Sequence, residues 1–239
     1  MAEPETTRRE PRILALGDAA VSVVFGDQIA PEVHARVAAF CAALAGAKIE
    51  GVAEWAPAFA SATVWYDPDR IAFADLAPRL AALAAAPAPA PRQGDLIELP
   101  FCADDEFAPD LAEVARLKGL TPQDWLARLK ALTLDVYMLG FQPGFAYLGV
   151  LPDILSVPRL ATPRKEVPAG SLAIADKMCA AYPFASPGGW RLIGRTPAPL
   201  FDLRNDSRPT LLAPGDRVRW RAVTRADYDA LAHAMSAVP

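Results

Sequence analysis

The sequence contains few histidines and cysteines, two residue types that many enzymes use for chemistry. Among 239 residues there are two histidines, His34 and His233, and three cysteines. Both histidines fall in predicted helices at opposite ends of the chain, so a Ser-His-Asp, Cys-His or multi-histidine metal site is hard to build. Cys41, Cys102 and Cys179 are odd in number and widely spaced. We therefore expect no disulfide framework, no metal site and a reducing, cytoplasmic location.

Several motifs and segments are also absent. The sequence has no GxxxxGK[ST] phosphate loop, no GxGxxG turn after a strand and no GxSxG nucleophile elbow. No run reaches the roughly 18 uninterrupted apolar residues of a membrane-spanning helix, and residues 1–12 lack the apolar core of a signal peptide. The net charge of −4 disfavours a protein that binds the phosphate backbone of nucleic acids. We expect neither a nucleic-acid partner nor a membrane partner.

An alternating Ala-Pro stretch divides the sequence. Residues 84–91 are AAAPAPAP, a pattern that cannot continue a helix and favours a semi-rigid extended linker. We place the linker at residues 87–95. It separates a small α/β domain, residues 1–86, from a larger domain, residues 96–239.

The first domain shows the pattern of strand pairs that are each followed by a helix. The predicted strands are residues 12–16, 21–25, 49–55 and 61–66, and the predicted helices are 31–44 and 75–85. Val37, Phe40 and Leu44 fall on one stripe of the first helix, as in a helix that covers a core. The order ββαββα predicts a small antiparallel sheet backed by two helices.

The second domain begins with a strand and two short helices and continues as short apolar runs between Pro- and Gly-rich turns. Thr121, followed by a proline and by an acidic residue three positions on, predicts the start of the second helix. The predicted strands include 96–101, 136–139, 172–175, 190–193, 210–212 and 218–223. In the last strand Val218, Trp220 and Ala222 alternate with arginines, which predicts one buried face. Many short strands favour a barrel or sandwich for this domain. Because helices are predicted beside the strands in both domains, we expect an α+β chain.

Four unusual sequence blocks lie between residues 140 and 202. They are GFQPGFAYLG (140–149), ATPRKEVPAGS (161–171), YPFASPGGW (182–190) and RLIGRTPAPLFD (191–202). Glycine lets a backbone approach a ligand closely, and proline holds a loop in one shape. Arginine and lysine pair with carboxylate or phosphate. From composition alone, tight barrel turns with core aromatics explain the blocks as well as a binding site does.

The four blocks, in this order, resemble the family of KipI and of the B-type 5-oxoprolinase subunit, which is also called allophanate hydrolase subunit 1. GDAAVSVVFGD (17–27), VWYDPDRI (64–71) and Pro214-Gly215-Asp216 resemble other parts of that family, so the resemblance covers about residues 14–220. It implies a small α/β amino-terminal domain and a cyclophilin-like β-barrel carboxy-terminal domain. The sequence departs from the family at residues 128–131, which lack a histidine, and at 178–180, where Met-Cys-Ala replaces Gln-Thr-Gly.

The resemblance implies a non-autonomous subunit of a 5-oxoprolinase-type complex. Such a complex consumes ATP and opens the lactam ring of 5-oxoproline to glutamate, and its other members are a C-type sister protein and an A-type protein. The substrate would be a small amide or lactam. Two alternatives remain: a KipI-like regulator that docks on a kinase or enzyme without doing chemistry, and the carboxyltransferase half of a biotin-dependent urea carboxylase.

Activation of an unreactive amide requires positive donors and preorganised backbone N–H groups. The resemblance and the residue types together predict substrate-binding residues in three groups: positive charges, close backbone or polar contacts, and aromatic walls. These are Arg164, Lys165 and Arg195; Gln142, Gly144, Gly170, Ser171, Gly188 and Gly189; and Phe145, Tyr147 and Trp190. No general base is identifiable, and Asp135 and Glu166 are the candidates that the sequence leaves open.

Overall fold

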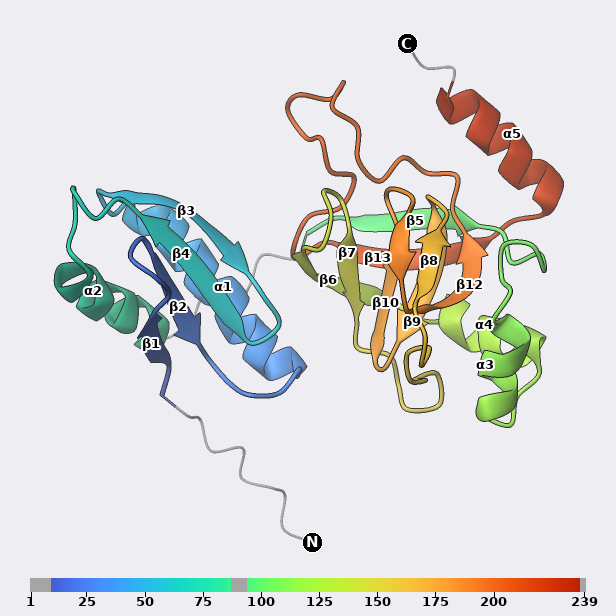
Figure 1. Cartoon of the computed structure of the whole chain (residues 1–239), viewed down its shortest axis with the longest axis horizontal. Helices are drawn as coiled ribbons and strands as arrows, with labels where there is room; N and C mark the ends of the chain where they lie inside the picture. Colours follow the sequence, from blue (N-terminus) through green and yellow to red (C-terminus); the bar gives the residue numbers. More distant parts are fainter. Residues whose placement is uncertain (1–9, 87–93, 237–239) are drawn as a thin grey trace, which may run out of the picture. The chain divides into compact units, whose positions relative to one another are not determined.

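The computed structural model describes residues 10–86 and 94–236 and divides into two compact units, residues 1–92 and 93–239 (Figure 1). Most of the predicted linker, residues 87–93, lies outside the described residues. No helix within the described ranges is long and apolar enough to cross a membrane.

The first unit is a four-stranded antiparallel sheet with two helices packed on one face (Figure 1). Its elements in chain order are β1 (Arg12–Ala15), β2 (Ala20–Val24), α1 (Pro31–Ala47), β3 (Val52–Pro57), β4 (Ser61–Tyr66) and α2 (Phe73–Ala85). The strand order is β1-β2-β4-β3. Val37, Phe40 and Leu44 of α1 pack with Val21 and Val64 of the sheet in one core. The predicted ββαββα order is confirmed.

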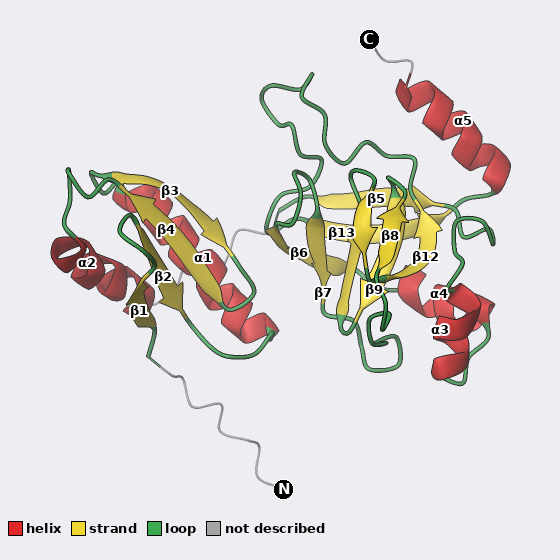
Figure 2. Ribbon diagram, viewed as in Figure 1, coloured by secondary structure: helices red, strands yellow, loops and turns green. Residues whose placement is uncertain are grey.

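The second unit is built on a seven-stranded sheet, shown in yellow in Figure 2. Its elements are β5 (Leu96–Phe101), α3 (Leu111–Leu117), α4 (Pro122–Lys130), β6 (Leu134–Leu139), β7 (Ala146–Gly149), β8 (Arg164–Val167), β9 (Ser171–Ala175), β10 (Met178–Ala181), β11 (Ser186–Gly188), β12 (Arg191–Arg195), β13 (Arg217–Ala222) and α5 (Arg225–Ser236). The strand order is β12-β9-β10-β7-β6-β13-β5, and β11 and β8 form a separate pair. Strands β5 and β13 run parallel, and the other adjacent pairs are antiparallel.

The seven-stranded sheet closes into a barrel between its two edge strands. Cys102, just after β5, and Arg195 of β12 exchange both backbone hydrogen bonds, each 2.8 Å long. Further along β12, Asp110 hydrogen-bonds to Leu192 much as a residue of a neighbouring strand would. Its backbone N donates to Leu192 O at 3.1 Å, and its Oδ2 accepts from Leu192 N at 2.6 Å. This short seam confirms the predicted barrel, since closure leaves β5 and β12 without a free edge at this point.

The barrel strands bury side chains on both faces. Alternate residues such as Leu148, Ile174 and Trp220 point into the interior, where Trp125 and Leu129 of α4 join the same core. The opposite residues of β7, β9, β10 and β12 form a second, smaller core beneath the β8–β11 pair. This double burial explains why β9 and β10 are almost entirely apolar, with no polar alternate positions.

Three local predictions can be compared with the structure. The Thr121 side chain accepts a hydrogen bond from Asp124 N at 3.1 Å, so the predicted helix start is confirmed. In β13 Val218 and Trp220 are buried, but Ala222 is exposed, because it ends the strand beyond the core. The predicted strand at 210–212 forms only an isolated bridge between Thr210 and Phe201.

Candidate functional site

Five aromatic side chains gather on the outer face of the barrel, beside the β8–β11 pair. The ring of Phe145 lies at their centre, 5.0 Å from Tyr147, 5.1 Å from Tyr182, 5.3 Å from Phe141 and 5.8 Å from Trp190. Phe145 and Tyr182 are buried, and Tyr147 and Trp190 are half-buried. Phe141 is 62% exposed. We call these five residues the aromatic cluster.

The loop before β7 carries the GFQPG sequence and shapes one side of the cluster. It is closed by hydrogen bonds from Gly140 N to Phe145 O (3.1 Å) and from Phe145 N to Gln142 O (3.0 Å). Phe141 has a φ of 68°, a left-handed conformation that costs a bulky residue free energy. The loop therefore holds an aromatic ring out of the core at some energetic cost.

Gly144 and Gln142 have different roles in the same loop. Gly144 has a φ of 79°, and a β-carbon there would lie 2.8 Å from Leu200 O, so only glycine fits. The Oε1 of Gln142 is buried and has no hydrogen-bond partner within the described part of the chain. A buried amide oxygen without a partner is costly unless a ligand or water satisfies it.

Gly188 and Gly189 lie against the cluster at the end of β11. A β-carbon at Gly188 would collide with the Tyr182 hydroxyl. One at Gly189 would lie 3.6 Å from Arg159 Nη2, and Gly189 O accepts a hydrogen bond from Leu160 N at 2.8 Å. The glycines let the β11–β12 connection pass close to an aromatic ring and to the segment around Arg159.

Burial raises the pKa of both Tyr147 and Tyr182, and the nearby positive charge of Arg159 partly opposes that rise. Both phenols are therefore neutral at physiological pH and can donate a hydrogen bond.

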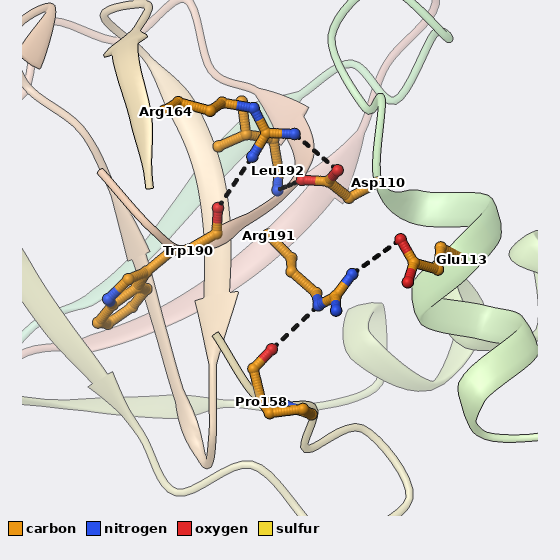
Figure 3. A network of polar contacts seen from close by, with 7 residues as sticks. All are labelled: Asp110, Glu113, Pro158, Arg164, Trp190, Arg191 and Leu192. Carbon is orange, nitrogen blue, oxygen red and sulfur yellow. Dashed lines mark hydrogen bonds and ion pairs between the residues drawn. The ribbon is translucent and has the colours of Figure 1, made fainter. Parts of the chain in front are cut away.

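Arg164 is held by a carboxylate at the start of helix α3. Its Nη2 lies 2.7 Å from Asp110 Oδ1, and its Nη1 donates to Trp190 O at 3.4 Å (Figure 3). The Trp190 indole points away from this guanidinium (Figure 3). Because Asp110 is only 7% exposed, Arg164 neutralises a buried charge.

A second arginine joins the same region. Arg191 places Nη1 2.9 Å from Glu113 Oε2 and donates from Nε to Pro158 O at 3.0 Å (Figure 3). Neither carboxylate, Asp110 nor Glu113, is among the predicted site residues. The two ion pairs attach β8 and β12 to α3.

Arg195, Gly170 and Ser171 lie along the barrel seam. The Arg195 guanidinium stacks over the Phe107 ring at 4.4 Å. Gly170 has a φ of 78°, and a β-carbon there would collide with Thr196 O. Gly170 N donates to Tyr182 O at 2.7 Å, which connects this group to the aromatic cluster through the backbone. Ser171 is 1% exposed and begins β9.

The remaining candidates lie on exposed strand positions. Lys165 and Glu166 are exposed on β8. Asp135 pairs in register with Arg217; although the residue is exposed, partial desolvation of its carboxyl by neighbouring atoms raises the pKa, and the positive charge of Arg217 opposes the rise. Within residues 10–86 and 94–236, no three His, Cys, Asp or Glu side chains group together as they would around a metal ion.

The structure therefore brings together most of the predicted site residues. Three of them, Phe145, Tyr147 and Trp190, belong to the aromatic cluster, and four others lie on the loops beside it: Gln142, Gly144, Gly188 and Gly189. Two residues beside the cluster, Tyr182 and Arg159, are not among the predicted site residues, although Tyr182 stands in one of the four blocks and Arg159 lies two residues before another.

Comparisons with known proteins agree with this architecture. The family model described as "Carboxyltransferase domain, subdomain C and D" matches residues 11–212. The B-type 5-oxoprolinase subunit of Bacillus subtilis (strain 168) is 37% identical over 233 residues, covering 92% of this chain and 95% of that protein.

Two solved structures share the fold. TTHA0988 is 33% identical with a TM-score of 0.74, and the match covers 85% of this chain but 40% of that longer one. The K. lactis urea amidolyase has a TM-score of 0.74 at 19% identity, over 95% of this chain and 16% of that one, which shows a common fold. The chain belongs to the carboxyltransferase domain, subdomain C and D, family, in which it is similar along nearly its whole length to a B-type 5-oxoprolinase subunit.

Proposed function

We propose that this chain is the B-type subunit of a 5-oxoprolinase complex, which opens the lactam of 5-oxoproline to glutamate with consumption of ATP. The observation that carries the proposal is the similarity to the B-type protein of Bacillus subtilis over 92% of this chain and 95% of that protein. A match of this extent includes both compact units and all four sequence blocks. The chain would act in the cytoplasm together with a C-type and an A-type protein.

The substrate-binding surface in this proposal is the aromatic cluster and the loops beside it. A small lactam ring is nearly flat and apolar on its faces, so it packs well against the half-buried rings of Tyr147 and Trp190. The amide edge of the ring also needs polar partners, which the loops beside the cluster would supply. Gly188 and Gly189 let the β11–β12 connection pass close to Tyr182 and Arg159, which keeps these side chains beside the cluster.

The arginines and the seam residues have a supporting role in this proposal. Arg164 neutralises Asp110 and holds the carbonyl of Trp190, so it positions an aromatic wall. Arg195, Gly170 and Ser171 fix the start of β9 and, through Gly170 N, the backbone of Tyr182. ATP supplies the activation of the amide in the complex.

Reconstitution tests the proposal directly. The chain is co-expressed with a C-type and an A-type protein, the complex is purified, and ATP hydrolysis is measured with and without 5-oxoproline. We expect hydrolysis that depends on all three proteins and on 5-oxoproline, with glutamate formed in proportion. A stable complex without lactam-dependent turnover would contradict the proposal and favour the KipI-like regulatory role.

The carboxyltransferase alternative is favoured by one observation, the description of the matching family as a carboxyltransferase domain. It requires a biotinylated partner. Streptavidin capture from the native organism separates the two roles: co-purification of this chain with a biotinylated protein supports the carboxyltransferase role, whereas glutamate formation by the complex of three proteins without biotin contradicts it.

A further inference from the structure

The cationic side chains around the aromatic cluster differ in what neutralises them. Arg164 pairs with Asp110, and Arg191 pairs with Glu113. Arg159 is exposed, and no carboxylate within the described residues forms an ion pair with it. Its charge is therefore available to a ligand.

The backbone on both sides of Arg159 is fixed to the barrel. Three hydrogen bonds hold consecutive parts of the segment 157–160: Asp176 N to Val157 O at 2.7 Å, Arg191 Nε to Pro158 O at 3.0 Å and Leu160 N to Gly189 O at 2.8 Å. Pro158 also restricts the residue before it. An arginine on such a segment loses less conformational freedom on binding than one on a loose loop, because its backbone is already ordered.

The guanidinium of Arg159 lies beside the cluster. The position of a β-carbon at Gly189 is 3.6 Å from Arg159 Nη2 and 3.5 Å from Pro163 Cγ, so glycine leaves room next to the charged group. Gly189 directly precedes Trp190, whose ring lies 5.8 Å from that of Tyr147. The positive charge of Arg159 also acts on the hydroxyls of Tyr147 and Tyr182, where it lowers each pKa against the effect of burial.

We propose that Arg159 binds the carboxylate of a small cyclic amide whose ring packs against Tyr147 and Trp190. The inference rests on the proposed function and adds to it the residue that recognises the acidic group of the substrate. A guanidinium donates two parallel hydrogen bonds to a carboxylate, and the two aromatic rings accept the apolar faces of a five-membered ring. The carboxylate is what distinguishes 5-oxoproline from the plain lactam 2-pyrrolidinone.

The same role does not suit Arg164. A ligand carboxylate beside Arg164 would also face Asp110, 2.7 Å from Nη2, and like charges at such a distance repel. Arg195 does not suit this role either, because its guanidinium stacks on the Phe107 ring at 4.4 Å. The guanidinium of Arg225 lies at the same distance from that ring.

Binding to the purified full chain tests the assignment. Titration calorimetry is carried out with 5-oxoproline and with 2-pyrrolidinone, and quenching of tryptophan fluorescence gives a second signal. For 5-oxoproline we expect Arg159→Ala to weaken binding roughly 10- to 100-fold, as for loss of a charge-assisted contact. For 2-pyrrolidinone, Arg159→Ala should leave the affinity unchanged. Arg159→Lys should recover part of the loss, and Arg116→Ala, which removes an exposed arginine on α3, should match the unmodified chain.

Equal affinities of the unmodified chain and Arg159→Ala for 5-oxoproline would overturn the inference, as would an equal loss for both compounds. If the isolated chain binds neither compound, the comparison is made in the reconstituted complex, where Arg159→Ala should raise the KM for 5-oxoproline and an unchanged KM overturns it. Failure of the proposed function would give a different result. The unmodified complex would show no turnover, although the chain still binds 5-oxoproline more tightly than 2-pyrrolidinone and loses this preference in Arg159→Ala. If the chain binds neither compound and the complex shows no turnover, both the Arg159 assignment and the proposed function are overturned.

Discussion

At the scale of single residues, Asp110 connects three parts of the second unit. Its carboxylate accepts hydrogen bonds from Arg164 of β8 and from the backbone of Leu192 in β12. Asp110 itself directly precedes helix α3. The two hydrogen bonds offset the cost of placing a carboxylate where water hardly reaches it.

Asp110→Asn keeps the size of the side chain and removes its charge. We expect the free energy of unfolding of the second unit to fall by about 1–3 kcal/mol, because Arg164 loses its counter-charge and one acceptor oxygen becomes a donor. Urea denaturation followed by tryptophan fluorescence measures the change. Asp153→Asn is the matched control, since Asp153 also pairs with a cation, Lys177, but is 86% exposed. Equal midpoints for the two variants would show that the Asp110 ion pair does not stabilise the unit.

The sequence predicts the aromatic residues of the site better than its charges. Phe145, Tyr147 and Trp190 stand in blocks that the family resemblance marks together, and their rings do meet. The partner of Arg164 could not be predicted, because Asp110 lies 54 positions earlier and reaches it only through the packing of α3 on β12. Charge pairing depends on that packing, whereas aromatic residues cluster wherever a core forms.

At the scale of secondary-structure elements, the turn before β9 depends on Gly170. The turn has a positive φ and leaves no space for a β-carbon, which would collide with Thr196 O. The sequence PAGS indicates a glycine turn. That Thr196, just after the end of β12, lies close against this turn is seen only in the structure.

Gly170→Ala should lower the free energy of unfolding by more than the left-handed conformation alone requires. Gly119→Ala is the matched control, because Gly119 also has a positive φ, 66°, but no atom lies within 4 Å of its β-carbon position. We expect a loss of about 1–2 kcal/mol for Gly119→Ala and a larger loss for Gly170→Ala, measured by urea denaturation. Equal losses would mean that the turn moves easily to accommodate the methyl group.

The strands differ in how well the sequence predicts them. Strands β4 and β5 match their predicted bounds, Ser61–Tyr66 and Leu96–Phe101, because both are mostly apolar or β-branched segments of ordinary strand length. Strands β8 and β11 are short and lie partly exposed over the outer face of the barrel. Their sequences, RKEV and SPG, carry no alternating pattern, so nothing in them predicts a strand.

At the scale of the whole molecule, the two units should differ in their response to acid. Burial lowers the pKa of His34 in α1, and a hydrogen bond with the backbone of Ala58 opposes the effect. Since its folded pKa lies below the unfolded value of about 6.5, the unfolded chain binds a proton that the folded unit does not. The first unit therefore loses stability as the pH falls below that value.

Thermal unfolding of the full chain between pH 7.5 and 5.5 tests this. We expect the transition of the first unit to move to lower temperature as the pH falls, and to move less in His34→Gln, which stays neutral and can still donate to Ala58. An identical pH dependence in both proteins would assign the effect to other groups.

The parallel pairing of β5 with β13 has a consequence for synthesis on the ribosome. Asp95, next to β5, bonds to Asp216, next to β13, across 121 positions of sequence. The first strand of the second unit thus emerges early and has no neighbour in the sheet until almost the whole chain has been translated. Contacts of such long range form slowly, and an unpaired strand is open to association with other chains. Nascent chains that stop before residue 217 would expose β5, so premature termination should yield aggregates rather than a smaller soluble barrel.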